Sequence, residues 1–305
     1  MNDALISIIS PVFNEQESLL EFYSRLSKVL KDLGMRYEII FVDDGSSDNS
    51  SEILAGLKRK DLSVRVLTFS RNFGHQIAVK AGLDHAQGDG VVIIDTDLQD
   101  PPEFIPALTQ KWKEGYDVVY AVRAERSGEG FFKKCTASLY YSLIRRIASV
   151  SIPVNTGDFR LISSEVVAVL RGIREQSPYL RGLISWVGFR QIGIPMNREA
   201  RFAGKTKYPL RKMLSLAWSG ITHFSFFPLR LAGIVGSVLL AVSAVWLGRI
   251  FYIQAAFSGG EPLAALILFV SGIQLLSIAI LGQYLAFNYD QSRARPLYIL
   301  KKSND

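Results

Sequence analysis

Five short apolar segments, separated by stretches with helical patterning, constrain the fold of this chain more than any other feature. They cover residues 5–12, 37–42, 64–69, 91–94 and 118–122 and are rich in Val, Ile and Phe. Near-continuous apolar runs of this length are typical of parallel strands that are buried on both faces. The stretches between them, at 15–33, 48–60, 73–86 and 102–115, are predicted to be helices. The alternation predicts an open, mostly parallel α/β sheet with flanking helices.

Each of the first four predicted strands ends in a polar motif. PVFNE follows the first strand, DDGSSD the second, SRNFGH the third and DTDLQD the fourth. In open α/β sheets, ligands bind at the carboxyl ends of the strands. Four polar loops at one edge of the sheet therefore predict a binding site there.

Asp95 and Asp97, in the fourth of these loops, are the most informative pair of side chains. They lie one residue apart, directly after the apolar run 91–94. Hard divalent cations prefer oxygen ligands, and Mg²⁺ usually combines one or two carboxylates with phosphate oxygens and water. The alternative is a turn whose acids only cap the next helix, which opens at Pro101 and Pro102. With the other polar loops beside it, the pair favours a metal and phosphate site.

Two long apolar segments near the C-terminus predict a membrane-spanning hairpin. Residues 231–257 contain one charged side chain, Arg249, and residues 263–287 contain none. A bilayer core of about 30 Å needs about 20 apolar helical residues, so each segment is long enough to span. Basic residues flank both segments, whereas the connection at 258–262 has no Lys or Arg. The positive-inside rule then places both termini in the cytoplasm.

These features divide the chain into four expected parts. Residues 1–205 are expected to form a cytoplasmic α/β domain, 206–228 an interfacial amphipathic helix, 229–287 the two-helix transmembrane hairpin and 288–305 a cytoplasmic basic tail. The interfacial helix is predicted from an apolar stripe at helical spacing, formed by Leu210, Met213, Leu214, Ala217, Trp218, Ile221 and Phe224. Residues 1–10 lead straight into a strand and do not resemble a signal peptide. The expected location is therefore the plasma membrane, as an integral protein.

The net charge of +7 indicates a partner that is anionic. It arises from 35 basic and 28 acidic residues. Because the basic excess lies largely beside the predicted spans, anionic lipid or a lipid phosphate explains it more simply than nucleic acid does. Small residues in the spans, such as Gly233, Gly236 and Gly272, would permit close helix approach within one chain or in a homo-oligomer.

The motifs, taken together and in order, resemble those of membrane-bound family 2 glycosyltransferases. The matching stretches are PVFNE, VDDGSSD, SRNFGH, GDGVVIIDTDLQDPPE, NTGDFRL and AGKTKY, followed by the two apolar segments. The most similar group is the polyprenyl-phosphate glycosyltransferases, which include bacterial undecaprenyl-phosphate glucosyltransferases and dolichyl-phosphate mannose synthases. The resemblance implies a GT-A fold, a nucleotide-sugar donor, Mg²⁺ or Mn²⁺, and inversion at the anomeric carbon.

The resemblance also implies roles for individual residues of the donor site. It assigns the nucleoside to a set of residues in the first two loops: Pro11, Phe13, Asn14, Glu15, Asp43 and Asp44. Arg71 would lie near the base or the diphosphate. Asp95 and Asp97 would hold the metal and the sugar diphosphate, with Asp97 as the direct ligand and Gln99 close by.

Asp158 of the NTGDFRL motif is implied to lie near the acceptor, where a general base usually sits. A lipid phosphate complicates that role, because its second pKa is about 6 by analogy with other phosphate monoesters and it is already an anion at neutral pH. Asp158 either takes a proton or positions the sugar or acceptor. Arg160 would hold Asp158 or contact the donor.

An anionic acceptor also requires cations near the membrane surface. The candidates for its phosphate are Arg123, Arg126, Lys133, Lys134, Ser138, Lys205 and Lys207. The alternative for the lysines at 205 and 207 is general attraction to the membrane surface, worth about 1 kcal/mol per basic residue. His75, His85 and His223 are scattered, without the paired spacing of a zinc site.

The expected function is transfer of one hexose, glucose from UDP-glucose, to undecaprenyl phosphate on the cytoplasmic face of the membrane. The enzymatic alternatives use GDP-mannose or a modified UDP-pentose. The alternative from another class is an inactive lipid-binding scaffold. An enzyme is favoured because the acidic residues expected of one are all intact: Asp43, Asp44, Asp95, Asp97 and Asp158.

Overall fold

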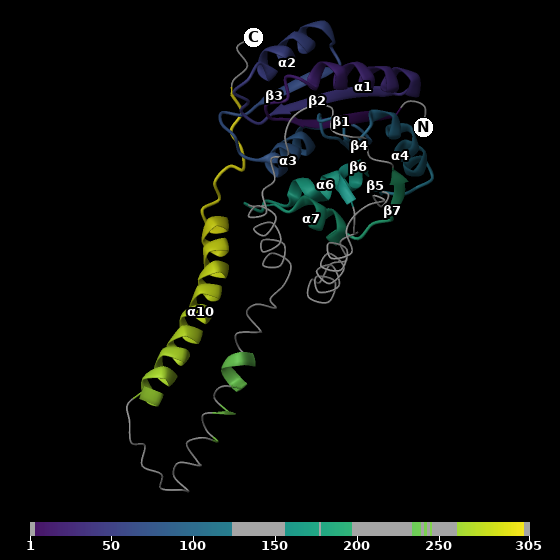
Figure 1. Ribbon diagram of the computed structural model, residues 1–305. Helices are drawn as coiled ribbons and strands as arrows, with labels where there is room; N and C mark the ends of the chain where they lie inside the picture. The colour runs from purple at the N-terminus through teal and green to yellow at the C-terminus, as the bar shows by residue number, and fades with distance from the viewer. Residues whose placement is uncertain are drawn as a thin grey trace, which may run out of the picture. The chain divides into compact units, whose positions relative to one another are not determined.

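The computed structural model describes residues 4–123, 156–176, 178–196, 234–238, 241–242, 245 and 261–301 (Figure 1). The chain divides into two compact units. The first comprises Met1–Arg145, Val150–Pro209 and Arg295–Asp305, and the second comprises Arg146–Ser149 and Leu210–Ala294. Arg126, Lys133, Lys134, Ser138, Lys205, Lys207 and the predicted interfacial helix lie outside the described residues.

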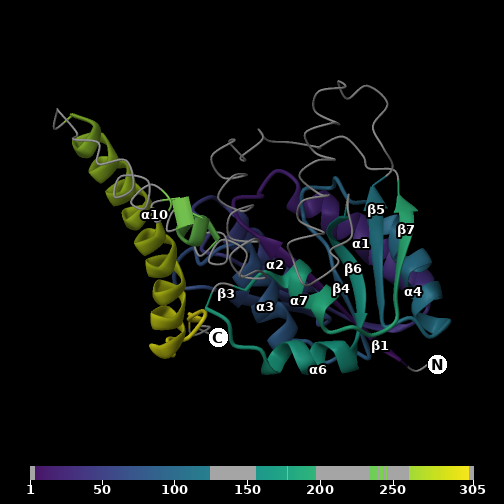
Figure 2. The same cartoon turned by 90° about the horizontal axis from the view of Figure 1, so that it is seen from below.

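A seven-stranded sheet forms the centre of the first unit, in the order β3-β2-β1-β4-β6-β5-β7. The strands are β1 (Leu5–Val12), β2 (Arg36–Asp43), β3 (Val64–Thr68), β4 (Gly90–Ile93), β5 (Val118–Arg123), β6 (Thr156–Ser163) and β7 (Gln191–Met196). The first five strands confirm the sequence prediction. All neighbouring pairs are parallel except those of β6, which runs antiparallel to both β4 and β5. Figure 2 shows β4, β6, β5 and β7 side by side.

Helices cover both faces of this sheet. They are α1 (Leu19–Leu33), α2 (Ser50–Lys60), α3 (His75–His85), α4 (Ile105–Lys113), α6 (Ser164–Gly172) and α7 (Leu180–Trp186), with a short 3₁₀ turn η1 (Pro102–Phe104) before α4. α1 contacts α2, η1 and α4, whereas α3 contacts α6, which in turn contacts α7. The two groups lie on opposite sides of the strands in Figure 1.

Burial of the strands explains why the sheet is stable. The β1 and β2 side chains Ile6, Ile8, Ile39 and Phe41 are fully buried and pack with α1 residues such as Phe22. Full burial of one such side chain contributes about 1.5–3 kcal/mol relative to exposure. The apolar pattern of the strands is thus the pattern of a sheet covered on both faces, with its loops left to form a site.

The second unit contains α10 (Glu261–Ser292), a helix of 32 residues. Its stretch Phe269–Ser292 reaches a mean hydropathy of 1.6, and none of that apolar window is buried. Among the described residues it is the one helix long and apolar enough to cross a bilayer. It includes the second predicted apolar segment and continues past residue 287 to Ser292. The first segment lies largely outside the described residues, with residues 234–238 helical.

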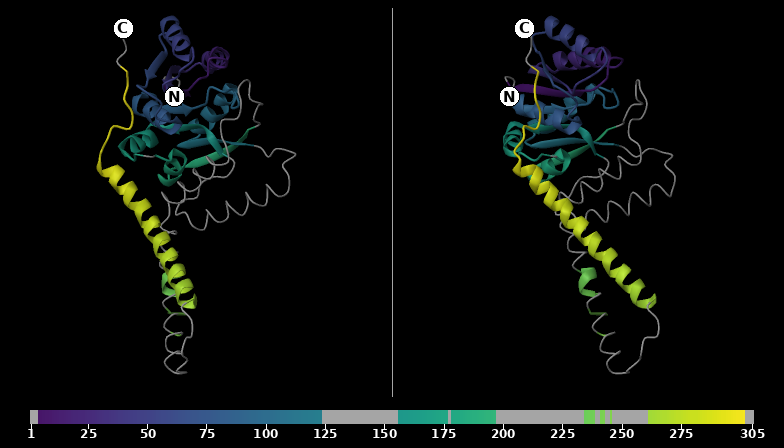
Figure 3. Two further views of the ribbon diagram at one scale, coloured as in Figure 1. Left: turned by 60° about the vertical axis from the view of Figure 1, so that its left-hand side comes forward. Right: turned by 90° about the vertical axis from the view of Figure 1, so that its left-hand side faces the viewer.

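Residues 295–301 belong to the first unit, and Leu300 forms an antiparallel bridge with Phe69, directly after β3. Figure 3 shows this yellow segment running along the first unit in both views. The edge of the sheet at β3 is therefore partly covered by the C-terminal segment.

Candidate active site

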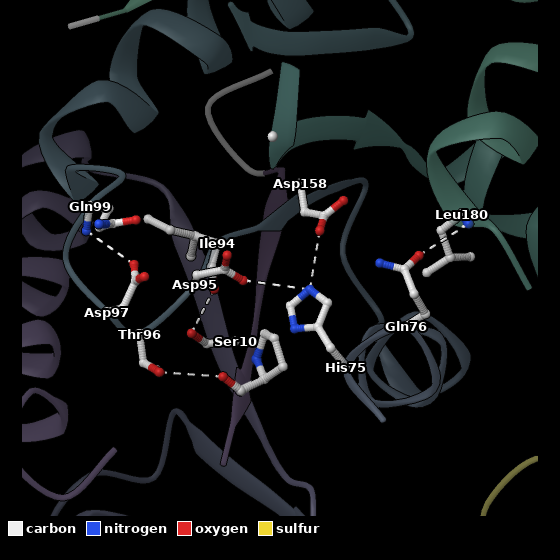
Figure 4. Close-up of polar contacts among 12 residues, drawn as sticks. Ser10, His75, Gln76, Ile94, Asp95, Thr96, Asp97, Gln99, Asp158 and Leu180 are labelled. Carbon is white, nitrogen blue, oxygen red and sulfur yellow. Dashed lines mark hydrogen bonds and ion pairs between the residues drawn. The ribbon is translucent and has the colours of Figure 1, made fainter. Parts of the chain in front are cut away.

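The four polar loops meet at one edge of the sheet, as predicted, and β6 adds a fifth contribution from within the sheet. The backbone of the first loop is tied to the fourth, because Ser10 Oγ donates to the carbonyl of Ile94 at 2.8 Å and Thr96 Oγ1 to that of Pro11 at 3.4 Å. Figure 4 shows these contacts beneath Asp95, Asp97 and Asp158. β6 pairs with β4 and so brings Asp158 beside the loop that follows β4.

Asp158 is held by two cationic side chains. Arg181 Nε donates to Asp158 Oδ1 at 2.7 Å and Arg181 Nη2 to Oδ2 at 3.0 Å, a two-point contact. His75 Nε2 lies 3.2 Å from the same Oδ2. Burial alone would raise the pKa of Asp158, but the charge of Arg181 and the hydrogen bonds from His75 and Arg181 hold that pKa well below its usual range. Asp158 is therefore an ionised and weakly basic carboxylate.

His75 connects Asp158 to the loop after β4. Its Nε2 lies 3.7 Å from Asp95 Oδ1, so the imidazole stands between two carboxylates (Figure 4). Burial would lower the pKa of His75, but the charges of Asp95 and Asp158 and the hydrogen bond to Asp158 raise it to about 9. At neutral pH, His75 is an imidazolium.

Sequence reasoning missed both cations. It treated His75 as one of three scattered histidines and gave Arg181 no role. His75 ends the SRNFGH motif and is the first residue of α3, so its place in a polar loop at the site edge was a usable signal. Arg181, in α7, follows no motif, and only the packing of α7 near β6 brings it to Asp158.

The loop after β4 carries two carboxylates that could hold a metal. Asp95 Oδ1 is buried and has no hydrogen-bond partner among the described residues, and burial raises the pKa of Asp95. Asp97 Oδ1 accepts the backbone N–H of Gln99 at 3.1 Å. The described residues contain no group of three His, Cys, Asp or Glu side chains arranged for a metal. The pair therefore suits an ion such as Mg²⁺ that completes its shell with phosphate oxygens and water.

Two residues other than glycine adopt the left-handed backbone conformation in the loops at the site edge. Leu98, which is buried, has φ of 59°, and Asn14, in the loop after β1, has φ of 55°. Non-glycine residues in the left-handed region are uncommon and cluster at functional sites. Both positions lie at the edge where the site was predicted.

Asp43 and Asp44, predicted to bind the nucleoside, organise the loops around them. Asp43 Oδ1 accepts the N–H of Ser46 at 2.9 Å. Asp44 is buried and accepts the N–H groups of Phe73 and Gly74 at 2.7 and 3.0 Å. Both carboxylates are thus used to fix the second and third loops, and the nucleoside contacts assigned to them stay a prediction.

The first and second loops are also joined to each other. Asn14 Oδ1 accepts the N–H of Ser47 at 2.8 Å, and Ser50 Oγ accepts the N–H of Glu15 at 2.9 Å. Phe13 is exposed beside them, with 39% of its surface accessible. An exposed aromatic ring on rigid loops can stack on a base.

The two predicted arginines near the site differ in environment. Arg71 is exposed and its guanidinium lies 4.2 Å above the ring of Phe73. Arg160 is buried and donates to the carbonyls of Gly157 at 2.7 Å and Asp158 at 3.3 Å. These hydrogen bonds of Arg160 therefore support the backbone around Asp158. Arg123 ends β5, and the side chain lies outside what the structure describes.

This chain is similar in sequence to known glycosyltransferases. Residues 7–171 match the model of glycosyl transferase family 2. An uncharacterized glycosyltransferase of Bacillus subtilis is 46% identical over 301 residues, covering 97% of this chain and 93% of that protein. The SfII prophage-derived bactoprenol glucosyl transferase of Shigella flexneri is 41% identical over 304 residues, covering 98% of each.

A solved structure, the glucosyl-3-phosphoglycerate synthase of Mycobacterium tuberculosis, has a TM-score of 0.49 and 21% identity to this chain, covering 72% of it and 78% of that protein. The family match extends from β1 to α6 and includes the loops with Asp44 and Asp97 and the strand β6 with Asp158. The chain belongs to glycosyl transferase family 2.

Proposed function

We propose that this protein transfers one glucose from UDP-glucose to a polyprenyl phosphate, with inversion at the anomeric carbon. The observation that carries the proposal is the similarity to a bactoprenol glucosyl transferase over 98% of both chains. A similarity of that extent includes the loops of the α/β domain and the C-terminal apolar helix. Bactoprenol is a polyprenyl lipid, so its phosphate is the acceptor that we assign to this chain.

The donor would lie along the loops after β1, β2, β3 and β4. Phe13 offers a ring for the base, and Asp95 with Asp97 would hold a divalent cation against the diphosphate. Such a cation, when bound, neutralises charge that develops on the leaving nucleoside diphosphate. Asp95 Oδ1 supports this assignment, because it is buried without a hydrogen-bond partner among the described residues and its contact with His75 Nε2 is long, at 3.7 Å.

In the transfer, an oxygen of the acceptor phosphate forms a bond to the anomeric carbon and the bond from that carbon to UDP breaks. The transition state is oxocarbenium-like. The acceptor, with a second pKa of about 6, carries no proton that must be removed at neutral pH. Asp158 is a weak base because Arg181 and His75 stabilise its ionised form. The arrangement favours a role for Asp158 in positioning the sugar or the acceptor over proton removal.

The two cations beside Asp158 add a second contribution. Arg181 and His75 place positive charge near the carboxylates at the site edge. Fixed charges of this kind stabilise anionic groups without reorganisation during the reaction. With Arg123, they would favour the approach of a lipid phosphate.

The membrane arrangement that we propose retains the predicted hairpin. α10 forms the second span, and residues 231–257 the first, with both termini on the cytoplasmic face. The uncharged stretch 263–287 of α10 and the exposed apolar side chains of this helix support the assignment. The donor site would then face the cytoplasm, where nucleotide sugars are made available to the acceptor headgroup.

The test is transfer of radiolabelled sugar to undecaprenyl phosphate by the purified full-length protein. UDP-glucose, UDP-galactose and GDP-mannose are compared, each with Mn²⁺, with Mg²⁺ and with EDTA. Metal-dependent labelling of lipid from UDP-glucose is expected. Labelling from GDP-mannose alone would assign the mannose alternative, and no labelling from any donor by folded protein would contradict the proposal.

A further inference from the structure

The C-terminal segment 295–301 is hydrogen-bonded to the chain at the end of β3. Ser70 donates its backbone N–H to the carbonyl of Ile299 at 2.9 Å, and Lys301 donates to the carbonyl of Thr68 at 2.8 Å. Gln176 Nε2 donates to the carbonyl of Arg295 at 2.8 Å at the other end of the segment. The segment, drawn in yellow in Figure 3, is thus fixed at both ends to the first unit.

Tyr298 anchors the middle of this segment. Its ring stacks on that of Phe69, with centroids 5.3 Å apart and planes 16° apart. Its hydroxyl donates to Asp84 Oδ2 at 3.2 Å, and the other oxygen of Asp84 accepts from the buried Lys80 at 2.6 Å. Burial, together with the charge of Asp84, raises the pKa of Tyr298 above its usual range. An aromatic pair of this kind is worth about 0.5–1.5 kcal/mol beyond its buried area.

The residue that Tyr298 stacks on leads directly into the loop after β3. Phe69 is fully buried and packs edge-on against Phe73, with centroids 5.5 Å apart. The guanidinium of Arg71 lies over the ring of Phe73, and the backbone N–H of Phe73 donates to Asp44. A continuous series of ring contacts therefore connects Tyr298 with the loop 70–74, which ends beside His75.

Covering an exposed sheet edge is the simplest role for such a segment, since unpaired edges promote association. That role requires backbone pairing with β3, but it does not require an aromatic contact to Phe69, the residue between β3 and the loop. The hydrogen bond from Ser70, the first residue of that loop, falls outside the strand as well. The contacts fall on Thr68, Phe69 and Ser70, where the strand passes into the loop.

We propose that segment 295–301 supports the donor site and that Tyr298 is a positioning residue, which fixes the loop 70–74 in the conformation that binds the nucleotide diphosphate. This inference rests on the proposed function, which places the donor along that loop. The C-terminal segment then contributes to donor affinity without touching the donor, because it orders Phe73 and Arg71 in advance.

The test compares Tyr298→Ala and Tyr298→Phe in the full-length protein in detergent, with Tyr289→Ala as the matched control. Tyr289 is an exposed tyrosine of α10, whose ring lies under Arg293 and outside the segment. Hydrogen–deuterium exchange at residues 70–74 and the Kd of UDP with Mn²⁺ are measured for each variant. The donor KM and the acceptor KM are then measured separately.

Tyr298→Ala is expected to accelerate exchange at 70–74 and to weaken UDP binding and raise the donor KM by about 5-fold or more, a typical coupling between sites. The acceptor KM should stay unchanged. Tyr298→Phe keeps the stacked ring and loses only the hydrogen bond from the hydroxyl to the Asp84 carboxylate. This variant should therefore retain most of the wild-type affinity for UDP. Tyr289→Ala should match the wild type in all four measurements.

Three results would overturn the inference. Unchanged exchange at 70–74 in Tyr298→Ala would show that the ring does not order the loop. Faster exchange with unchanged UDP affinity would show that the loop order does not matter for the donor. Equal changes in the donor KM and the acceptor KM, together with a lower Tm, would show that Tyr298 has only a structural role. By contrast, no UDP binding by the wild type would refute the proposed donor itself, and the inference would fall with it.

Discussion

Arg181 binds both carboxylate oxygens of Asp158, at 2.7 and 3.0 Å, and thereby connects α7 to β6 at the centre of the candidate site. The planar guanidinium matches a carboxylate at two points, which a lysine cannot do. The contact fixes the orientation of Asp158 as well as its charge. In a transfer that depends on the position of the sugar, orientation is the more demanding requirement.

Arg181→Lys should therefore lower kcat while the protein remains folded. The substitution keeps the positive charge and removes the two-point contact, and a displacement of about 1 Å at a catalytic group can cost about 10²-fold in rate. The measurement is kcat for glucose transfer together with Tm. Arg190→Lys is the control, since Arg190 lies over the ring of Tyr116 and away from Asp158. Near-normal kcat in Arg181→Lys would contradict the positioning role.

Asp97→Ala should abolish metal-dependent transfer without unfolding the protein. Loss of a metal that stabilises several kcal/mol of developing charge corresponds to a rate decrease on the order of 10²–10⁴-fold. The measurements are the transfer rate over a range of Mn²⁺ concentrations and the effect of Mn²⁺ on the Kd of UDP. Asp32→Asn, an exposed carboxylate of α1, serves as the control. If Asp97→Ala keeps near-normal rates with metal, the metal assignment is wrong.

Gly45→Ala should weaken nucleotide binding, because the added methyl group would push apart the loops that follow β2 and β3. Gly45 has φ of 72°, and a Cβ there would lie 2.6 Å from the backbone carbon of Arg71. The left-handed conformation alone costs a residue with a side chain about 1–3 kcal/mol. The measurements are Tm and the Kd of UDP.

The control for that substitution is Gly56→Ala in α2, where a Cβ would meet nothing within 4 Å. Alanine is favoured over glycine inside a helix by roughly 0.5–1 kcal/mol, so this variant should be as stable as the wild type or more so. A Gly45→Ala protein that binds UDP as tightly as Gly56→Ala would show that the two loops tolerate separation.

The environment of Glu38, a residue outside the candidate site, predicts how the stability of the fold depends on pH. It is buried and accepts from Ser7 Oγ at 2.6 Å, Arg65 Nη1 at 2.7 Å and the N–H of Gln87 at 2.7 Å. Burial would raise the pKa of Glu38, but these hydrogen bonds and the charge of Arg65 lower it. Because the folded pKa is below the unfolded value of about 4.3, the stabilisation is complete above that value and is lost as pH falls through the folded pKa.

Glu38→Gln should accordingly lower Tm at neutral pH, through a loss of roughly 1.5–3 kcal/mol for hydrogen bonds to a charged group. The difference in Tm from the wild type should shrink below about pH 4. Glu52→Gln, at an exposed position of α2, should show little difference at any pH. A difference in Tm between Glu38→Gln and wild type that is constant from pH 3 to pH 7 would contradict the pKa shift.

Local sequence pattern was sufficient for the outline of this fold. The apolar runs at 5–12, 37–42 and 64–69 became β1, β2 and β3 with ends shifted by at most one residue, because strands buried on both faces need continuous apolar sequence. The same pattern located the site edge, since polar residues that directly follow parallel strands must share one side of the sheet.

β6 and β7 were not predicted, although β6 lies between β4 and β5 in the sheet. The motif NTGDFRL was read for chemistry and not for conformation. Antiparallel insertion of β6 depends on pairing with strands more than 30 residues away along the chain, so no local periodicity could indicate its neighbours.

By itself, the sequence determined the alternating α/β pattern, the polar loops, the Asp95–Asp97 pair and the apolar stretch of α10, because each depends on residues that are close together in the chain. The tertiary structure decided which charges meet. Arg181 and His75 reach Asp158 across 23 and 83 positions of the chain, and Tyr298 reaches Asp84 across 214. Contacts over such separations follow from the packing of whole elements, and the hydrogen bonds and pKa values of the site follow from those contacts.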